Sequence, residues 1–175
     1  VKWGGEMNRE EVLASVKKAA QDGATELNLA SRAIEYLPTE IGGLSDLVHL
    51  DLDDNSFPHV PVEIGNLTRL KVLRLGGNHA LKLIPQEIFN LPNLTELTLP
   101  GFETAVPPQI GELGSLEILG IVSGSLKTLP EAIANCTNLT ELYVNLTRLQ
   151  ELPAGIGKLI NLRKLHLWNI TFEPS

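Results

Sequence analysis

Residues 47–69 read LVHLDLDDNSFPHVPVEIGNLTR, and the next stretch, residues 70–93, reads LKVLRLGGNHALKLIPQEIFNLPN. The two stretches share leucines, a proline and an isoleucine at corresponding positions, so the chain contains an internal repeat. An earlier copy begins at Ala24, and further copies begin at Leu94, Leu116, Leu139 and Leu162. From Leu47 onward the steps are 23, 24, 22, 23 and 23 residues. The common frame, LxxLxLxxNxLxxLPxxIxxLxx, decides the fold.

Each copy of the frame predicts a short strand followed by a return segment. In the LxL part, alternate side chains point to opposite faces, so Leu50 and Leu52 point inward while Asp51 faces solvent. Because proline cannot donate a backbone hydrogen bond, the LPxxIxxL part is expected to return as a short helical or irregular segment. One copy cannot bury its own leucines. Successive copies must therefore stack into a continuous core with a curved parallel sheet of about seven strands.

The frame resembles that of leucine-rich repeat proteins over residues 24 to about 172. The resemblance implies an α/β fold, a right-handed arc-shaped solenoid whose parallel strands line a concave face. The 23-residue length and the LPxxIGxL return are similar to Ras-group-related plant intracellular repeats and to bacterial repeats joined to Roc-type GTPase domains. The GxIP return that plant extracellular receptors favour is absent from the sequence. We expect residues 1–23 to form an N-terminal segment with a capping helix, and residues 24–175 to hold six full repeats and one partial repeat.

The two ends of the array differ. Asn8 and Glu11 have the spacing of a capping box, and Gly23 suits a helix end. The apolar stripe between them consists of Val12, Leu13, Val16, Ala19 and Ala20. Residues 8–22 are therefore predicted to form a helix that covers the first repeat. The last repeat stops after its strand, so we expect an uncovered C-terminal edge that self-association or an adjoining domain of a longer protein would cover.

The position after the strand is usually asparagine in this family, where its amide links neighbouring turns into a ladder. Asn55 and Asn78 keep this residue. The other five positions hold Arg32, Phe102, Gly124, Thr147 and Ile170. More than half of the ladder is therefore expected to be missing, and backbone groups there need other partners.

Composition narrows the class of function. The chain has 14 basic and 21 acidic residues and a net charge of −7, which disfavours binding to a nucleic-acid backbone. No stretch is long and apolar enough to cross a membrane. The single cysteine, Cys136, excludes a disulfide framework, and its leucine position predicts a buried, unreactive thiol. We expect a cytoplasmic protein, or one delivered into a host cytoplasm if it is an effector.

No motif of an enzyme accompanies the repeats. The phosphate-loop, dinucleotide-binding, zinc-protease and hydrolase-elbow motifs are absent from the sequence. His49, Asp51 and Asp53 alternate along one strand in steps of about 6.6 Å, too far apart to share a metal ion without help. We therefore predict no catalytic site, no cofactor site and no metal site.

The outward strand positions form the candidate binding surface. One row of equivalent positions holds Glu26, His49, Val72, Glu96, Ile118, Glu141 and Lys164; the next holds Asn28, Asp51, Arg74, Thr98, Gly120, Tyr143 and His166; the third holds Ala30, Asp53, Gly76, Pro100, Val122, Asn145 and Trp168. The first repeats are acidic, the middle is nearly bare, and the last repeats are aromatic and basic. The candidate partner-binding residues are Asp51, Asp53, Arg74, Tyr143, Lys164, His166 and Trp168.

Aromatic and charged side chains around an apolar strip are typical of protein interfaces. The predicted function is thus a protein–protein interaction module that binds a protein or peptide on the concave strand face, with no nucleic-acid or membrane partner. One alternative is that Asp51–Arg74 and Glu141–Lys164 are cross-strand pairs that only keep the surface soluble. Another is that the array recruits substrates for a larger enzyme, such as a bacterial effector ubiquitin ligase or a Roc-type GTPase.

Overall fold

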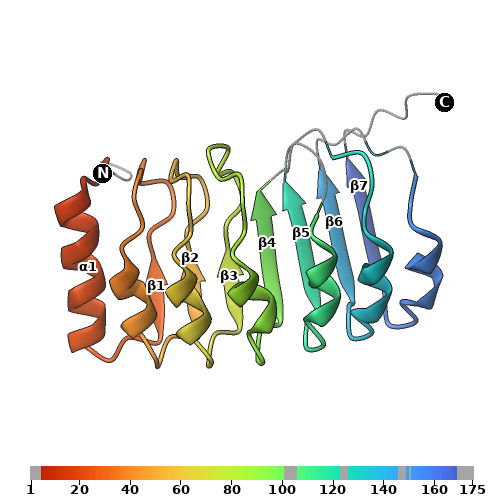
Figure 1. The fold of residues 1–175 in the computed structure, drawn as a ribbon, viewed down its shortest axis with the longest axis horizontal. Coiled ribbons are helices and arrows are strands. Elements are labelled where there is room, and N and C mark those ends of the chain that lie inside the picture. The colour runs from red at the N-terminus through yellow and green to blue at the C-terminus, as the bar shows by residue number, and fades with distance from the viewer. Residues whose placement is uncertain (1–4, 101–105, 123–125, 146–148, 150, 169–175) are drawn as a thin grey trace.

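The computed structural model describes residues 5–100, 106–122, 126–145, 149 and 151–168. The chain begins with helix α1 (Arg9–Gln21), and seven short strands follow (Figure 1). The strands are β1 (Glu26–Asn28), β2 (His49–Asp51), β3 (Val72–Arg74), β4 (Glu96–Pro100), β5 (Ile118–Val122), β6 (Glu141–Asn145) and β7 (Lys164–Trp168). One 3₁₀ helix lies between each two successive strands: η1 (Thr39–Gly43), η2 (Val62–Asn66), η3 (Gln86–Asn90), η4 (Pro108–Glu112), η5 (Glu131–Asn135) and η6 (Ala154–Lys158).

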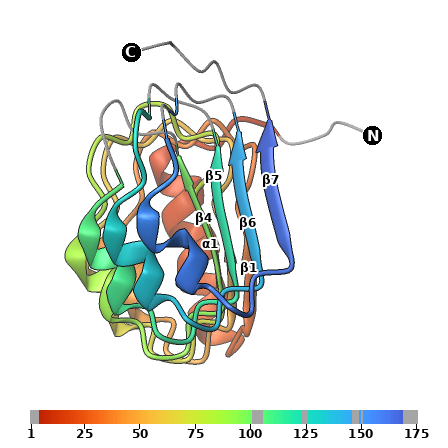
Figure 2. The same ribbon diagram turned by 90° about the vertical axis from the view of Figure 1, so that its right-hand side faces the viewer.

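The strands form one parallel sheet in the order of the sequence, β1 to β7. Equivalent residues of successive repeats lie side by side, so that Leu50 pairs with Leu27 on one side and with Leu73 on the other. All the 3₁₀ helices cover one side of the sheet, here called the outer face, as the end view shows (Figure 2). The opposite side, the strand face, carries the outward side chains of the strands. This architecture is a leucine-rich repeat solenoid, as the sequence predicts.

The repeated leucines fill one continuous core. Inward strand residues such as Leu50, Leu73 and Leu97 are fully buried, and so are the isoleucines of the returns, such as Ile41 and Ile64. The same cluster of buried residues runs from α1 through the repeats that follow. Each such side chain contributes about 1.5–3 kcal/mol relative to an exposed one. The core therefore depends on every layer having neighbours.

Each return begins at a proline that directly precedes a 3₁₀ helix. These prolines are Pro38, Pro61, Pro85, Pro107, Pro130 and Pro153, with φ between −59° and −73°. The proline carbonyl accepts the first bond of the helix, as from Ile41 N to Pro38 O at 3.1 Å. Proline has the φ that the turn needs and no N–H to leave unpaired. The prediction of a short helical return is confirmed.

Helix α1 covers the first repeat as expected. The Asn8 side chain accepts bonds from Glu10 N and Glu11 N at 2.9 and 3.1 Å, and Asn8 N donates to Glu11 Oε2 at 2.8 Å, which completes a capping box. Val12, Val16 and Ala19 are buried within the core of the repeats, whereas Ala20, predicted to belong to the same stripe, is exposed. Gly23 ends the helix with φ +60°, a conformation that glycine adopts without strain.

The predicted asparagine ladder exists at two positions. Asn55 Nδ2 donates to Leu29 O and Leu52 O at 2.9 and 3.0 Å, so it links the turn of one repeat to the turn of the previous repeat. Asn78 makes the equivalent bonds to Leu52 O and Leu75 O, both at 2.9 Å. Its Oδ1 atom is buried and has no partner among the described residues. The predicted gaps at 102, 124, 147 and 170 lie outside the described residues.

A second ladder of side-chain hydrogen bonds, which was not predicted from the sequence, lies just before the N-terminal ends of the strands. It uses the residue before the first leucine of each repeat, whose side chain donates to a backbone carbonyl of the previous repeat. The bonds run from Asn93 to Thr68 O at 2.8 Å, from Ser115 to Pro92 O at 3.0 Å, from Asn138 to Gly114 O at 2.7 Å and from Asn161 to Thr137 O at 2.8 Å. Near the N-terminus the same position holds Asp46 and Arg69, which form an ion pair at 2.7 Å.

Glycines allow successive 3₁₀ helices to lie close together. A Cβ atom at Gly42 would lie 2.5 Å from Glu63 O of the next repeat, and one at Gly111 would lie 2.5 Å from Ala132 O. A Cβ atom at Gly65 would lie 2.7 Å from the Cβ of Glu87. The glycine of the LPxxIG pattern is therefore a packing requirement of the outer face.

This close contact predicts that Gly42→Ala destabilises the array by about 1–3 kcal/mol, because η1 and η2 must move apart to admit the methyl group. Gly43→Ala is the matched control, since a Cβ atom there has no neighbour within 4 Å. We expect the control to stay within about 0.5 kcal/mol of the parent chain. Urea denaturation measures both changes, and equal stabilities of the two variants would contradict the packing argument.

Candidate functional site

The strand register places the predicted binding residues on one face. Asp51 pairs with Arg74 across β2 and β3, and Tyr143 pairs with His166 across β6 and β7. Asp53 lies two residues after the end of β2, while Lys164 and Trp168 are the first and last residues of β7. The structure therefore brings the seven residues into two groups. Strands β4 and β5 separate these groups.

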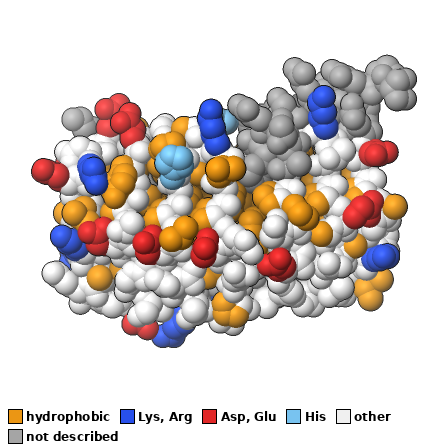
Figure 3. Space-filling view, viewed as in Figure 1, with side chains coloured by type: hydrophobic (Ala, Val, Ile, Leu, Met, Phe, Trp, Pro, Cys, Tyr) orange, Lys and Arg blue, Asp and Glu red, His pale blue; other side chains and the backbone are white. Residues whose placement is uncertain are grey.

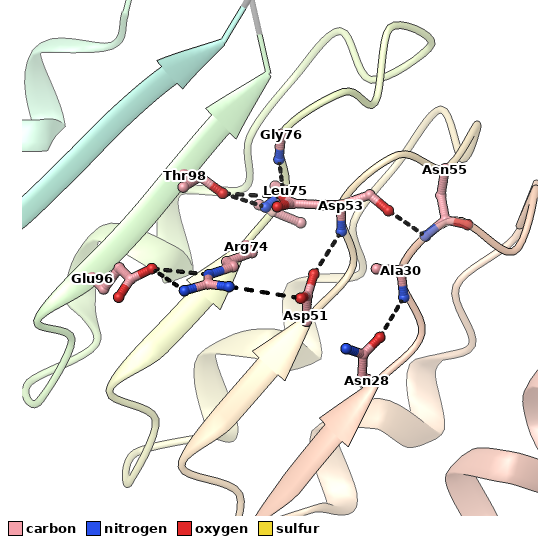
Figure 4. Close-up of polar contacts among 10 residues, drawn as sticks. All are labelled: Asn28, Ala30, Asp51, Asp53, Asn55, Arg74, Leu75, Gly76, Glu96 and Thr98. Atoms are coloured by element: carbon pink, nitrogen blue, oxygen red, sulfur yellow. Dashed lines mark hydrogen bonds and ion pairs between the residues drawn. The ribbon is translucent and has the colours of Figure 1, made fainter. Parts of the chain in front are cut away.

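The first group centres on Arg74, which lies between two carboxylates of neighbouring strands (Figure 4). Its Nη2 atom lies 2.8 Å from Glu96 Oε1, and its Nη1 atom lies 3.9 Å from Asp51 Oδ2. The hydrogen bond to Glu96 raises the pKa of Arg74. The guanidinium is thus held in a fixed position above the sheet, and its partner Glu96 was not among the predicted binding residues.

Asp53 links three successive repeats (Figure 4). Its Oδ1 atom accepts bonds from Gly76 N at 2.6 Å and from the Thr98 hydroxyl at 3.1 Å. Burial raises the pKa of Asp53, and the nearby charge of Asp51 raises it further, whereas the bonds from Gly76 and Thr98 oppose the shift. Asp53, which the sequence predicts as a contact residue, thus organises the surface from a partly buried position.

The middle of the strand face has few side chains. Gly76 and Gly120 have none, and a Cβ atom at Gly120 would lie 3.1 Å from Thr98 Cγ2. Val72 and Ile118 are only partly exposed. Apart from Arg74 and Glu96, which bond to each other at one side of this strip, no long charged side chain projects from it, so a polypeptide backbone can approach the sheet closely over Gly76 and Gly120.

The second group is a stack of rings on β6 and β7. The Tyr143 and His166 rings are nearly parallel, with centroids 4.8 Å apart and an interplanar angle of 6°. The Trp168 ring lies 5.0 Å from that of His166 at 57°, and Trp168 is 53% exposed. Such rings present a large apolar area that little side-chain motion can disturb. We call Tyr143, His166 and Trp168 the aromatic cluster.

An ion pair between Lys164 and Glu141 is bonded to the aromatic cluster through the Tyr143 hydroxyl. Lys164 Nζ lies 2.7 Å from Glu141 Oε1, and the Tyr143 hydroxyl donates to Glu141 Oε2. The bond from Lys164, followed by that from Tyr143, lowers the pKa of Glu141, and the bond to Glu141 raises the pKa of Tyr143. Both predicted cross-strand pairs therefore exist. In this group the pair also fixes the orientation of the partly exposed Tyr143 ring.

The described residues offer little for catalysis. Cys136 is fully buried, its thiol donates to Ile110 O at 3.2 Å, and burial raises its pKa to about 11. A thiolate nucleophile does not form under such conditions near neutral pH. Within the described ranges, no three or more histidine, cysteine or acidic side chains are grouped as metal ligands would be. None of the described helices has the length and apolar character needed to cross a bilayer.

Known proteins of similar sequence and structure support the fold. Receptor-like protein 41 of Arabidopsis thaliana is 32% identical over 123 residues, which are 67% of this chain and 14% of that protein. The solved plant peptide hormone receptor RGFR1, in complex with RGF2, is 33% identical with a TM-score of 0.76 over 97% of this chain and 27% of the receptor chain. A leucine-rich repeat protein of Leptospira interrogans is 31% identical with a TM-score of 0.69 over 91% of this chain and 47% of that chain.

These matches show a leucine-rich repeat domain and cover only part of each relative. The chain spans 14% of the length of its curated relative and less than half of either solved chain. No protein-family model matches it. The similar proteins named above are receptors and a repeat protein.

The bonds of Asp53 predict a distinctive response to substitution and to pH. A raised pKa means that the folded chain binds this proton more tightly than the unfolded chain, so the ionised form costs stability at neutral pH. Asp53→Asn keeps an oxygen that Gly76 N and Thr98 can bond and removes the charge. We expect this variant to match or exceed the parent stability at neutral pH. The difference should shrink as the pH falls through the pKa of folded Asp53.

Urea denaturation of both chains at several pH values between about 7 and 3 measures this dependence. Asp53→Ala is the matched variant, because it leaves Gly76 N without an acceptor and should cost about 1–3 kcal/mol. An Asn variant that loses as much stability as the Ala variant would show that the carboxylate charge, rather than its acceptor oxygen, holds the three repeats.

Proposed function

We propose that this chain is a protein-interaction module that binds a polypeptide segment on the strand face and has no catalytic activity of its own. The observation that carries the proposal is the pair of ordered side-chain groups, on β2–β4 and on β6–β7, that flank a strip where Gly76 and Gly120 have no side chain and Val72, Thr98 and Ile118 are only partly exposed. A surface that merely stays soluble has no need to hold two partly exposed rings in a fixed stack beside an exposed tryptophan.

The spacing of the two groups indicates the size of the segment. Arg74 on β3 and Tyr143 on β6 are three strands apart, which is about 14 Å at the usual strand spacing. An extended chain that advances about 3.3 Å per residue crosses that distance in roughly four residues. We infer that the bound segment lies across the strands, with its backbone over Gly76 and Gly120. One end would contact the carboxylates beside Arg74 and the other would contact the aromatic cluster.

Order within the aromatic cluster favours tight contact. Tyr143 is held by its bond to Glu141 and by stacking on His166, so little side-chain freedom remains to be lost on binding. Trp168 offers its exposed ring beside them. Tryptophan and tyrosine are the residues that most often dominate binding energy at protein interfaces. The receptor RGFR1, similar to this chain and solved in complex with RGF2, supports a peptide as the kind of partner.

We also propose that the domain acts in the cytoplasm, on the basis of its 23-residue repeats and LPxxIxxL returns, which resemble plant intracellular and Roc-associated bacterial repeats. The likeness to plant receptors covers the fold and a small part of their length. Localisation of the tagged full-length protein by microscopy tests this assignment. Accumulation in the secretory pathway would contradict it.

A second candidate function is recruitment of substrates for a larger enzyme, such as an effector ubiquitin ligase or a Roc-type GTPase. It rests on the resemblance of the 23-residue repeats and LPxxIxxL returns to bacterial and Roc-associated repeats, with catalysis supplied by another domain. The full open reading frame, and whether it encodes a catalytic domain, tests this candidate.

Alanine substitution within the aromatic cluster tests the main proposal. Peptides are first selected against the parent chain from a random display library, and their affinities are then measured by calorimetry. Tyr143→Ala and Trp168→Ala should each weaken binding at least about tenfold, because each removes a large buried contact. Thr128→Ala on the outer face is the control and should leave the affinity unchanged. Unaltered affinity in the double variant Tyr143→Ala/Trp168→Ala would refute binding at this cluster.

A further inference from the structure

The outer face carries exposed apolar and aromatic side chains over its first three repeats. Tyr36, His59 and Leu83 occupy the same position, two residues before the proline of each return, and we call them the outer row. Leu83 is 74% exposed and Tyr36 is 37% exposed. His59 and Leu83 lie side by side in a parallel bridge between neighbouring returns. The same position holds Thr128 and Glu151 in repeats five and six, so the apolar character belongs to one half of the array.

A groove opens between the first two members of the outer row. Its volume is about 170 Å³, and it is lined mainly by Tyr36, Leu37, Pro58, His59 and Pro61. A cavity of about 150 Å³ with apolar walls accommodates benzene, so this groove has the size for one large apolar side chain. The guanidinium of Arg9 lies 4.0 Å from the centre of the Tyr36 ring and supports one wall.

A row of carboxylates runs parallel to the outer row. Glu40, Glu63 and Glu87 each lie four residues after a member of the outer row, in the first turns of η1, η2 and η3. Among the described side chains, none of the three has an ion-pair partner. The equivalent positions in repeats four to six hold Gln109, Ala132 and Gly155. Figure 3 shows acidic side chains beside apolar ones over this half of the outer face.

We propose that this surface binds a basic amphipathic helix of another protein. The apolar groove and the row of three glutamates lie together on repeats one to three, so a fitting occupant presents apolar and positive side chains together. Neighbouring repeats are about 4.8 Å apart, and residues three or four apart on one face of a helix are about 5–6 Å apart. Alternate residues of an extended strand are about 6.6 Å apart, which matches the repeats less well.

In the proposed complex the helix lies along the outer row and crosses three repeats. Apolar side chains at positions i, i+4 and i+7 fill the groove and contact Leu83, and lysine or arginine side chains on the adjoining stripe face the three glutamates. The helix lies on the side of the sheet opposite the aromatic cluster. The two surfaces can therefore be occupied at the same time, and this inference does not depend on binding at the strand face.

A pair of synthetic helical peptides tests the proposal. Each has about 18 residues and blocked ends, with leucine or phenylalanine at i, i+4, i+7 and i+11, because shorter helices are unstable in water. One carries lysines beside the apolar stripe, and the other carries glutamates there. The lysine peptide should bind the whole chain at least about tenfold more tightly than the glutamate peptide in fluorescence anisotropy, and added salt should reduce the difference.

Variants of the protein locate the site. Leu83→Glu should weaken the lysine peptide at least about tenfold, and the triple variant Glu40→Gln/Glu63→Gln/Glu87→Gln should weaken it and flatten its salt dependence. Because Leu83 is largely exposed, its replacement should leave the urea midpoint unchanged. Thr128→Glu places the same charge at the equivalent position of repeat five and is the matched control. Tyr143→Ala should also leave binding of the lysine peptide unchanged.

Three outcomes would overturn the proposal. The first is equal affinity of the two peptides or no binding of either. The second is unchanged affinity in Leu83→Glu, which would place the peptide elsewhere. The third is a dimer of the parent chain in sedimentation that Leu83→Glu dissociates, since this would assign the surface to a second copy of the chain.

Discussion

No layer of this molecule is complete on its own, because the leucines of one repeat are covered only by the leucines of its neighbours. The constraint extends to the outer face, where neighbouring 3₁₀ helices come so close that a Cβ atom at Gly42 would lie 2.5 Å from Glu63 O. Glycine at positions such as Gly42 and Gly111 meets this requirement. At the first layer, helix α1 takes the place of a preceding repeat, because its Val12 and Val16 side chains cover the core there.

Polar groups at the edges of the layers are satisfied by two different devices. At the ends of the strands, buried Asn55 and Asn78 tie the turns of the early repeats together. Before the strands, Asn138 and Asn161 link the later repeats through exposed amides. The later repeats lack asparagine at the position of Asn55 and Asn78, but the side chains before their strands still link neighbouring layers. As a result, the two halves of the array differ in how they are joined as well as in what they expose.

Much of the fold could be predicted from the sequence, because leucine spacing, proline position and the Asn8 capping box each have one simple structural meaning. The rows of the strand face could also be predicted, since the leucines of the LxL segments set the register even though the repeats differ in length by a residue. The bond between Asp53 and Thr98 could not, because it joins residues 45 positions apart through side-chain directions that spacing does not specify. The groove beside Tyr36 was missed for another reason: it lies on the returns, where the residues between the leucines follow no obvious pattern.

The bonds of Asp53 also restrict where repeats can be added to or removed from this array. In the later repeats, the side-chain hydrogen bonds of the described residues join only adjacent layers. Examples are the bond that Asn138 donates to Gly114 O and the bond that Glu131 accepts from Gly155 N. Duplication or deletion of one unit there would recreate the same junction. Asp53 contacts the next layer at Gly76 and the one beyond it at Thr98, so a unit inserted between them would break the set. Adding or removing a unit within repeats two to four would therefore break bonds of Asp53, whereas the same change toward the C-terminal half would keep the junctions described above.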